Sequence, residues 1–394
     1  MSVYLDHAAS APLRPEARDA WLAASELVGN ASSVHGAGQA VRRSLEDSRE
    51  RVARALDCDP IEVVFTSGGT ESVNLAVKGL WWARPEATVA VVLPDGEHHA
   101  TLDTVGWLAE AQGALVRPVS LTAEGGIPPA AFHEALEGAA LATALVANNE
   151  VGTVSPVADL AAAAAAADVP LHLDAVGAVP HLPVPFATLR GAHRGAGGLV
   201  AVSVSGHKVG APVGTGALVV SRHARLSALH HGGGQQRGLR SGTQDVAGAA
   251  ALAVALEATS AERDLQAPRL RALAEHLRDG IRRIVPGAEF LGAESERLPG
   301  HVHVLFPDAA GETLLFLLDQ RGVHVSTGSA CQAGVTEPSH VVLALGRDER
   351  AARSVLRLSL GRTSTAADVE RFLAALPEAY ARAAASSARG GSRS

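Results

Sequence analysis

A lysine at the end of a predicted strand is the first residue whose type and position indicate chemistry. Residues 202–208 (VSVSGHK) run from an apolar strand into a Ser-Gly-His-Lys turn that ends at Lys208. Ligands of α/β proteins bind at the carboxyl ends of strands, where an amine such as this one can form a Schiff base. A solvated loop lysine would give the same local pattern, so other residues must decide between the two interpretations.

Two further segments fit one kind of ligand. Residues 171–174 (LHLD) form a strand that ends in Asp174, whose carboxylate can pair with a protonated ring nitrogen, although strand-terminal aspartates more often cap helices. Residues 66–71 (TSGGTE) are a strand, a glycine turn and a helix start, an arrangement that points backbone N–H groups toward a phosphate. Phosphate turn, acid and lysine, in this order, are what pyridoxal phosphate needs from a protein.

The two cysteines lie in different settings, and two in 394 residues exclude a disulfide framework. Cys331 lies in residues 326–335 (STGSACQAGV), whose small and polar composition predicts an exposed, mobile loop suited to a nucleophile that must travel. Cys58 stands between Asp57 and Asp59, which should raise the pKa of its thiol, and we interpret it as structural.

Buried strands alternate with amphipathic helices over the first part of the chain. Strands are predicted at 62–66, 88–93, 142–147, 170–174, 199–204 and 216–220, and helices at 70–83, 99–112 and 157–168. Continuous apolar strands spaced by helices favour an α/β domain with a mostly parallel sheet buried on both faces.

The domain change is predicted inside a long helical stretch at 245–284, which we expect to be interrupted near Pro268. Residues 15–255 then form a large domain, and residues 1–14 and 256–384 form a smaller α+β domain that carries the Cys331 loop. Residues 385–394, rich in Ser, Gly and Arg, are expected to be a disordered tail.

Composition excludes several classes of protein. A hydrophobic content of 47% allows a large core, and a net charge of −7 leaves no excess basic surface for direct nucleic-acid binding. The first residues lack a basic, apolar leader, and no segment is apolar for long enough to span a bilayer, so a cytoplasmic protein without membrane contact is expected. The adjacent pairs His98/His99 and His230/His231 are poor chelators of one ion, and no metal is predicted.

The ordered motifs resemble those of cysteine desulfurases of the NifS/IscS-like group, in the class V aminotransferase family. The likeness covers nearly the whole chain, at 4–9 (YLDHAA), 66–74 (TSGGTESVN), 97–98 (EH), 148–152 (NNEVG), Asp174, 205–208 (SGHK), 231–243 (HGGGQQRGLRSGT), 328–331 (GSAC) and 357–362 (RLSLGR). It implies an aspartate-aminotransferase-like fold (fold type I of the pyridoxal-phosphate enzymes). It also implies removal of sulfur from L-cysteine, which gives L-alanine and a persulfide on Cys331.

The resemblance assigns the cofactor residues one by one. Lys208 is then the Schiff-base lysine, Asp174 the partner of the pyridine nitrogen, and His98 the residue that stacks on the ring and relays protons. The residues implied to cradle the phosphate are Gly69, Thr70, Ser205 and His207.

The resemblance also implies the substrate site and the quaternary structure. Asn149 would hold both cofactor and substrate, and Arg357 would bind the substrate carboxylate with its planar guanidinium. Thr243 would reach the phosphate bound by a partner subunit, which places the active sites at a homodimer interface. Cys331 would pass its sulfur to an acceptor protein, which can be an iron–sulfur cluster assembly scaffold, a tRNA-thiolating enzyme, a DNA-sulfurating system or a biosynthetic carrier.

The chain departs from the family pattern at two places. Residues 190–198 (RGAHRGAGG) look like an insertion, a flexible loop that can alter partner contacts, and Gly177 stands where relatives have a glutamine beside the cofactor. Selenocysteine lyase, another class V lyase and a transaminase remain alternatives, although a transaminase needs no thiol at Cys331. A non-catalytic sulfur-trafficking scaffold would require the loss of Lys208 or Asp174, and both are present.

Overall fold

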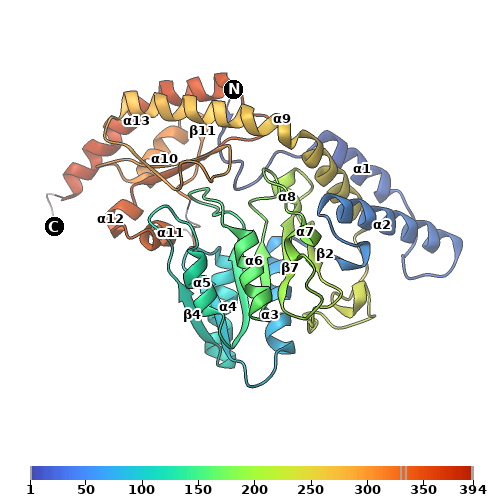
Figure 1. Cartoon of the computed structure of the whole chain (residues 1–394). Helices are drawn as coiled ribbons and strands as arrows, with labels where there is room; N and C mark the ends of the chain where they lie inside the picture. The colour runs from blue at the N-terminus through green and yellow to red at the C-terminus, as the bar shows by residue number, and fades with distance from the viewer. Residues whose placement is uncertain (1, 329–330, 333–334, 392–394) are drawn as a thin grey trace.

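The computed structural model describes residues 2–328, 331–332 and 335–391, and for residues 331–332, 335–336 and 389–391 it describes the backbone alone. The chain forms a large α/β unit with a smaller unit above it, and a long helix, α9, runs along both (Figure 1).

The large unit is built on a seven-stranded sheet of order β2-β8-β7-β6-β5-β3-β4. Only β8 runs antiparallel to its neighbours, and all other neighbouring strands of this sheet pair in parallel. Its strands are β2 (Val63–Thr66), β3 (Ala90–Pro94), β4 (Leu115–Val119), β5 (Ala139–Leu145), β6 (Pro170–Asp174), β7 (Gly198–Ser205) and β8 (Gly216–Val220). The predicted mostly parallel sheet is confirmed, and the sequence missed only β4 among these strands.

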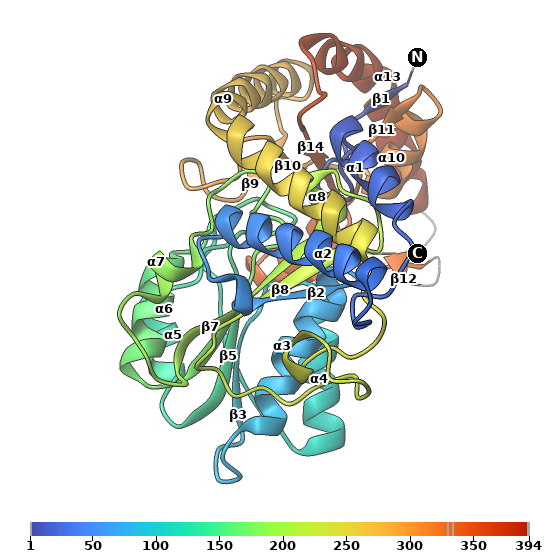
Figure 2. The same ribbon diagram turned by 90° about the vertical axis from the view of Figure 1, so that its right-hand side faces the viewer.

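Both faces of the sheet are covered by helices (Figures 1 and 2). The helices and 3-10 turns of this unit are α1 (Pro15–Ser25), α2 (Gly36–Ala55), η1 (Pro60–Glu62), α3 (Gly69–Ala83), α4 (His99–Gln112), α5 (Pro129–Ala135), α6 (Val157–Ala166), α7 (Phe186–Arg190), α8 (Gly206–Val209), η2 (Gln236–Gly238) and the first part of α9 (Val246–Ile284).

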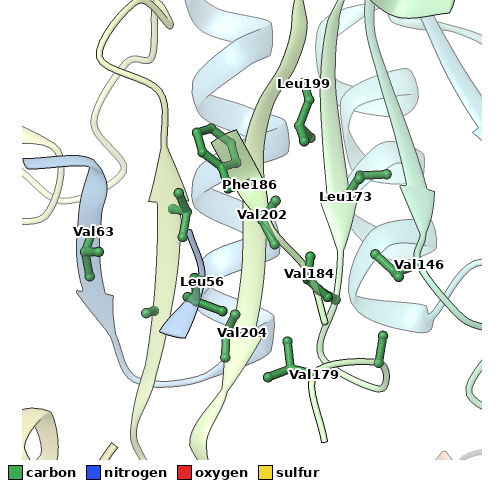
Figure 3. Packing of buried hydrophobic residues seen from close by; sticks show 14 of the residues in the cluster. Leu56, Val63, Val146, Leu173, Val179, Val184, Phe186, Leu199, Val202 and Val204 are labelled. Carbon is green, nitrogen blue, oxygen red and sulfur yellow. The ribbon is translucent and has the colours of Figure 1, made fainter. Parts of the chain in front are cut away.

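Successive residues of a strand pack into two different hydrophobic cores. Val63 and Phe65 pack into a cluster with residues of α2, α6 and α7, whereas Val64 between them packs with α3 and α4. Figure 3 shows part of the first cluster, in which Phe186 and Leu56 share one buried core with the strand residues Val63 and Val202. Because neighbouring side chains point to opposite faces and both faces are buried, the strands are apolar throughout.

The smaller unit has its own core of buried residues, which extends from Val3 and Leu5 to residues of the last helix. Its strands form a sheet of order β14-β10-β9, the parallel pair β1-β11 and the pair β12-β13. Its elements are β1 (Val3–Tyr4), β9 (Glu289–Leu291), β10 (His301–Leu305), α10 (Gly311–Asp319), β11 (Val323–His324), β12 (Cys331–Gln332), β13 (Val335–Thr336), α11 (His340–Ala344), α12 (Glu349–Ala352), β14 (Val355–Ser359) and α13 (Ala366–Gly391). Helix α9 contributes Leu256 to the first core and Leu270 to this one. We therefore propose that the domain boundary lies within α9, between these two leucines.

Two expectations about helices were wrong. Helix α9 continues through Pro268, where the missing N–H removes one hydrogen bond but the turns on either side pack against the two domains. Helix α13 extends to Gly391, so the disordered tail predicted from residue 385 is helical as far as residue 391. Alanine is a strong helix former, and its density here outweighs the Ser and Gly content. Residues 392–394 lie outside the described part.

The predicted insertion at 190–198 folds back on itself. Buried Arg190 donates hydrogen bonds to the carbonyls of Gly195 (2.7 Å) and Gly197 (3.4 Å), and also to that of Leu199. One guanidinium therefore closes this loop. Among the described residues, no helix is long and apolar enough to cross a membrane.

Candidate active site

A cavity lies at the carboxyl ends of the parallel strands, between the sheet and the smaller unit. Its lining brings together most of the residues that the sequence singled out, namely Gly69, Thr70, His98, Asn149, Asp174, Ser205, His207 and Lys208. Residues from the N-terminal arm and from α9, among them His7 and Arg263, complete its far side. Arg357 and Thr243 are not in this lining.

Lys208 lies in the short helix α8 that follows β7, between the sheet and α9 (Figure 1). Its Nζ donates to the carbonyl of Ala9 at 2.9 Å and also to that of Ala8. Burial, followed by the positive charge of Arg357, lowers the pKa of Lys208 to about 8. A substantial fraction of this amine is therefore neutral near physiological pH, as a nucleophilic lysine requires.

Asp174 ends β6, next to the strand that leads to Lys208. Its Oδ1 accepts from the backbone N–H of Val176 at 2.9 Å, and the side chain is buried. Burial raises the pKa of Asp174 to about 6, while the Val176 hydrogen bond and Lys208 oppose the rise. A carboxylate in this position is stabilised by any cation placed beside it, and a protonated ring nitrogen is such a cation.

The turn before α3 forms a cradle for an anion. Gly68 has φ of +149°, which L side chains rarely adopt, and a Cβ on Gly69 would come within 2.7 Å of Val176 Cγ2. The first backbone N–H groups of α3 and the helix dipole favour a negative group at this end. Ser205 Oγ lies beside the turn, is buried and has no hydrogen-bond partner in the described structure. A phosphate oxygen would satisfy it.

His98 is the N-cap residue of α4, and this role fixes its ring. Its Nδ1 accepts from the backbone N–H of Ala100 at 3.0 Å, so the neutral ring carries its proton on Nε2. Burial, followed by the charge of Lys208, lowers the pKa of His98 to about 4. The same two causes, in the same order, lower the pKa of His207 to about 4. Both rings are therefore neutral at physiological pH.

Arg357 reaches the site from β14 in the smaller unit. Its Nη1 donates to the carbonyl of Asn149 at 2.9 Å, and its Nη2 lies 2.9 Å from Asp6 Oδ1. Asn149 Oδ1 and Arg357 Nε are buried without a hydrogen-bond partner in the described structure. Thus the predicted carboxylate-binding arginine is near Asn149, and an aspartate of the N-terminal arm occupies one of its nitrogens.

Two predicted residues lie elsewhere. Thr243 is exposed, on the segment that precedes α9. The backbone of Cys331 pairs with that of Thr336 in the β12–β13 hairpin, but the Cys331 side chain and residues 329–330 lie outside the described part.

Cys58 is half-buried and free. Burial raises the pKa of its thiol far above the ordinary range, and Glu62, Asp59 and Asp57 raise it further. The sequence identified the two aspartates but not burial, which is the larger cause.

Three acidic residues near the cavity were not singled out by the sequence analysis: Asp6, Glu97 and Glu150. Glu97 is buried, its Oε1 accepts from the backbone N–H of Leu145 at 2.7 Å, and burial raises its pKa to about 8. Glu150 is buried beside the Ser339 hydroxyl. All three lie inside motifs of the resemblance, which was the only signal that could have found them.

The donor set fits a cofactor with a phosphate group and a basic ring nitrogen. The unpartnered Ser205 hydroxyl and the start of α3 suit the phosphate, Asp174 suits the ring nitrogen, and Lys208 suits an aldehyde. Within the described residues, no group of three or more His, Cys, Asp and Glu side chains comes together as a metal site would require.

Comparison with known proteins agrees with this geometry. Residues 3–372 match the model of the family Aminotransferase class-V. The chain is 46% identical to an IscS-like cysteine desulfurase of Mycobacterium tuberculosis, with 99% of this chain and 100% of the relative covered. It is 36% identical to a cysteine desulfurase IscS of Methanosarcina thermophila, with 96% and 91% covered.

Solved structures show the same architecture. A NifS-like protein matches with a TM-score of 0.89 at 30% identity, and covers 97% of this chain and 100% of its own. A structure of SspA in complex with cysteine matches with a TM-score of 0.77 at 31% identity, over 92% of this chain and 100% of that one. The chain therefore belongs to the class-V aminotransferase family, among its pyridoxal-phosphate-dependent cysteine desulfurases.

Proposed function

We propose that this enzyme removes sulfur from L-cysteine, releases L-alanine and keeps the sulfur as a persulfide on Cys331 for transfer to an acceptor protein. The observation that carries the proposal is one cavity that combines the amine of Lys208, with a pKa of about 8, the buried carboxyl group of Asp174 and the start of α3. SspA, a relative at 31% identity, has been solved with cysteine, which supports the choice of substrate.

The large domain would hold the cofactor. Lys208 would bind its aldehyde carbon, Asp174 would keep the ring nitrogen protonated, and Thr70, Ser205 and His207 with the first N–H groups of α3 would hold the phosphate. When bound, pyridoxal phosphate supplies an electron sink that weakens the bonds around the substrate's α-carbon.

His98 would lie against the cofactor ring and handle protons. Because its Nδ1 accepts from Ala100, the neutral ring has its N–H group on Nε2, which would donate a hydrogen bond in the cavity. To accept a proton, the ring would have to give up its capping bond to α4 at Nδ1, so proton transfer through His98 would require that this bond open.

Arg357 and Asn149 would hold the substrate. Binding of the substrate carboxylate requires a guanidinium nitrogen, and Nη2 is paired with Asp6. Substrate would therefore either use Nε, which has no partner in the described structure, or displace Asp6. The side-chain oxygen of Asn149 has no partner among the described residues and would accept from the cofactor or from the substrate.

The sulfur step balances without an external oxidant. The Cys331 thiolate attacks the substrate sulfur, the bond between that sulfur and the substrate β-carbon breaks, and a sulfur–sulfur bond forms on the enzyme. The β-carbon takes up a proton, so cysteine and a thiol become alanine and a persulfide.

The test is to mix enzyme and L-cysteine without a reductant and to analyse both products. We expect alanine and one additional sulfur atom on the peptide that contains Cys331, in equal amounts, and sulfide only after a thiol reductant is added. A keto acid in place of alanine would identify a transaminase. Turnover confined to selenocysteine would identify a lyase of that substrate. Either result would overturn the proposal.

We further propose a homodimer in which Thr243 contributes to the partner's phosphate site. Thr243 is exposed and does not line its own cavity. Its loop is anchored, because Arg240 pairs with Glu71 at 2.9 Å and the Gln236 amide bonds both the N–H and the carbonyl of Phe65. The strongly exposed side chains Val28, Val34 and Val213 supply apolar surface for an interface.

The dimer can be tested by light scattering and by complementation. Chains with Lys208→Ala and chains with Thr243→Val are mixed, so that a mixed dimer contains one site with both native residues. Activity above that of either parent supports the shared site. A monomer in solution, or no gain on mixing, contradicts it.

A further inference from the structure

The segment that carries Cys331 has two ends, Gly328 and Ser339, and both meet one buried carboxyl group. The Ser339 hydroxyl donates to Glu150 Oε2 at 2.5 Å. At the other end, a Cβ built on Gly328 would lie 3.0 Å from the same Oε2 and 3.2 Å from His303 Cε1. Gly328 has φ of +90°, so the chain enters the segment through a position that requires glycine.

The turn that carries Glu150 is itself firmly held. Asn148 Oδ1 accepts from the backbone N–H groups of Glu150 (2.9 Å) and Val151 (3.0 Å). The ring of His303, which is fully buried, donates from Nδ1 to the Glu150 carbonyl at 2.9 Å. The backbone of Glu150 is therefore fixed, which is what an anchor for two chain ends requires.

The same turn is bonded to the proposed substrate site. Arg357 Nη1 donates to the carbonyl of Asn149, the residue before Glu150. The backbone of Arg357 also exchanges hydrogen bonds with Ser326 in both directions, at 2.7 and 3.2 Å, two residues before Gly328. Arg357, the turn at Glu150 and both ends of the Cys331 segment therefore form one hydrogen-bonded assembly.

A buried carboxyl group at this position is costly. Glu150 is 1% exposed, and burial raises the pKa of its carboxyl group, with the Ser339 hydrogen bond as the first opposing cause. An apolar side chain of similar volume would avoid the cost of removing a carboxylate from water. A buried carboxyl group that costs stability is expected where the residue serves function.

We propose that Glu150 is a positioning residue that holds the two ends of the Cys331 segment together and in register with Arg357. The proposal rests on the proposed function, because the segment matters only if Cys331 receives the sulfur. Loss of the anchor would leave cofactor and substrate binding intact and would slow sulfur transfer to Cys331.

The experiment measures cysteine binding and sulfur transfer separately in the holoenzyme. Cysteine binding is followed by the change in visible absorption of the cofactor, and sulfur transfer by mass spectrometry of the Cys331 peptide after rapid quenching. In Glu150→Ala we expect persulfide formation to slow by about 10- to 100-fold, the cost of roughly an ångström of misplacement of a reacting group. The cysteine concentration that gives half of the absorption change should stay within about twofold of the native value, because the Glu150 anchor would act only after cysteine has bound. Glu150→Gln, which keeps an acceptor for Ser339, should slow transfer less and serves as the better-folded variant.

Ser339 supplies the matched comparison. Ser339→Ala should reproduce the slow transfer, Ser339→Thr should restore it, and the double variant with Glu150→Ala should be no slower than the slower single variant. Ser339 also caps α11, because its hydroxyl accepts from the backbone N–H of Val342. Asp348 caps α12 in the same way by accepting from the N–H of Ala351, so Asp348→Ala is the control for the loss of a helix cap alone. It should leave transfer unchanged.

Three results would overturn the inference: an unchanged transfer rate in both Glu150 variants, a fall in cysteine binding equal to the fall in transfer, or additive effects in the double variant. Failure of the proposed function would be distinguishable, since native enzyme would then place no sulfur on Cys331 at all.

Discussion

The proposed active site has two sides that are built in different ways: a first wall, which is the cavity lining on the large domain, and a second wall, which is Arg357 with the residues that hold it, beside that lining. On the large domain, Asp174 and Lys208 stand at the ends of adjacent parallel strands or just after them, so the sheet places each one locally. On the other wall, Arg357 is held by Asp6, 351 positions away in the chain, and by Asn149, 208 positions away. The first wall is set by one rigid sheet and suits a fixed cofactor. The second depends on how the two domains meet, and suits groups that bind substrate and sulfur.

The largest effect is expected on the first wall, from Lys208→Ala. The chain has only two lysines, Lys78 and Lys208, and Lys78 lies over the ring of Trp107 at 4.5 Å. With no other amine in the cavity, kcat should fall on the order of 10³-fold or more. Lys78→Ala is the matched control and should retain turnover. Steady-state alanine production measures both, and an active Lys208→Ala would refute the assignment.

Cys331→Ala should leave the cofactor and cysteine binding unchanged but abolish persulfide and reductant-released sulfide, because only the proposed sulfur acceptor is lost. Cys58→Ala is the control and should keep both products, since the raised pKa of the Cys58 thiol leaves it protonated. Mass spectrometry of the two cysteine peptides decides the matter. Sulfur found on Cys58 would reverse our choice of thiol.

A smaller effect on the second wall is expected from Arg357→Lys. Lysine keeps the charge but loses the two-pronged geometry, and one hydrogen bond to a charged group contributes about 1.5 to 3 kcal/mol, so KM for cysteine should rise roughly 10- to 100-fold. Cofactor content should not change. Arg350→Lys, at an exposed pair with Asp308, should be neutral. An unaltered KM would mean that another residue binds the carboxylate.

A further effect, on stability, is expected from Glu97, the residue before His98 of the first wall. Burial raises its pKa from 4.5 to about 8, so the folded state binds a proton more tightly than the unfolded chain does. Stability from this group is therefore full below about pH 4.5 and is lost as pH rises toward 8, by up to a few kcal/mol. Glu97→Gln should flatten this part of the pH profile of the free energy of unfolding, measured with urea. Equal slopes for the two proteins would contradict the assignment.

The contrast between the walls also explains what the sequence could predict. Residues 170–174 and 216–220 were placed as strands with the observed bounds, because an apolar run ended by a polar residue is a local signal. Strand β4 was missed because it is an edge strand, largely exposed, and contains Arg117 and Pro118.

Long-range pairing carried no local signal at all. The contact between Asp6 and Arg357 depends on the N-terminal arm joining the smaller unit through β1, and nothing near either residue indicates it. Glu97 and Glu150 are acidic residues that a sequence places on the surface by default, yet both are buried.

The smallest effect is expected at Gly177, which lines the cavity at the position where the family pattern implied a glutamine. A Cβ at this position would meet only the carbonyl of Ala147, at 3.9 Å, so Gly177→Gln can be accommodated without displacing the sheet. The new amide would donate to the cofactor's phenolic oxygen and stabilise its anionic form. One such bond is worth about 1.5 to 3 kcal/mol, enough to slow cofactor loss by roughly tenfold and to lower the midpoint of the pH-dependent visible absorption by about one unit. Gly177→Ala adds a Cβ without a donor and should change neither quantity. If the glutamine variant titrates as the native enzyme does, another group already supplies the donor, and the first wall does not need the side chain that this chain lacks.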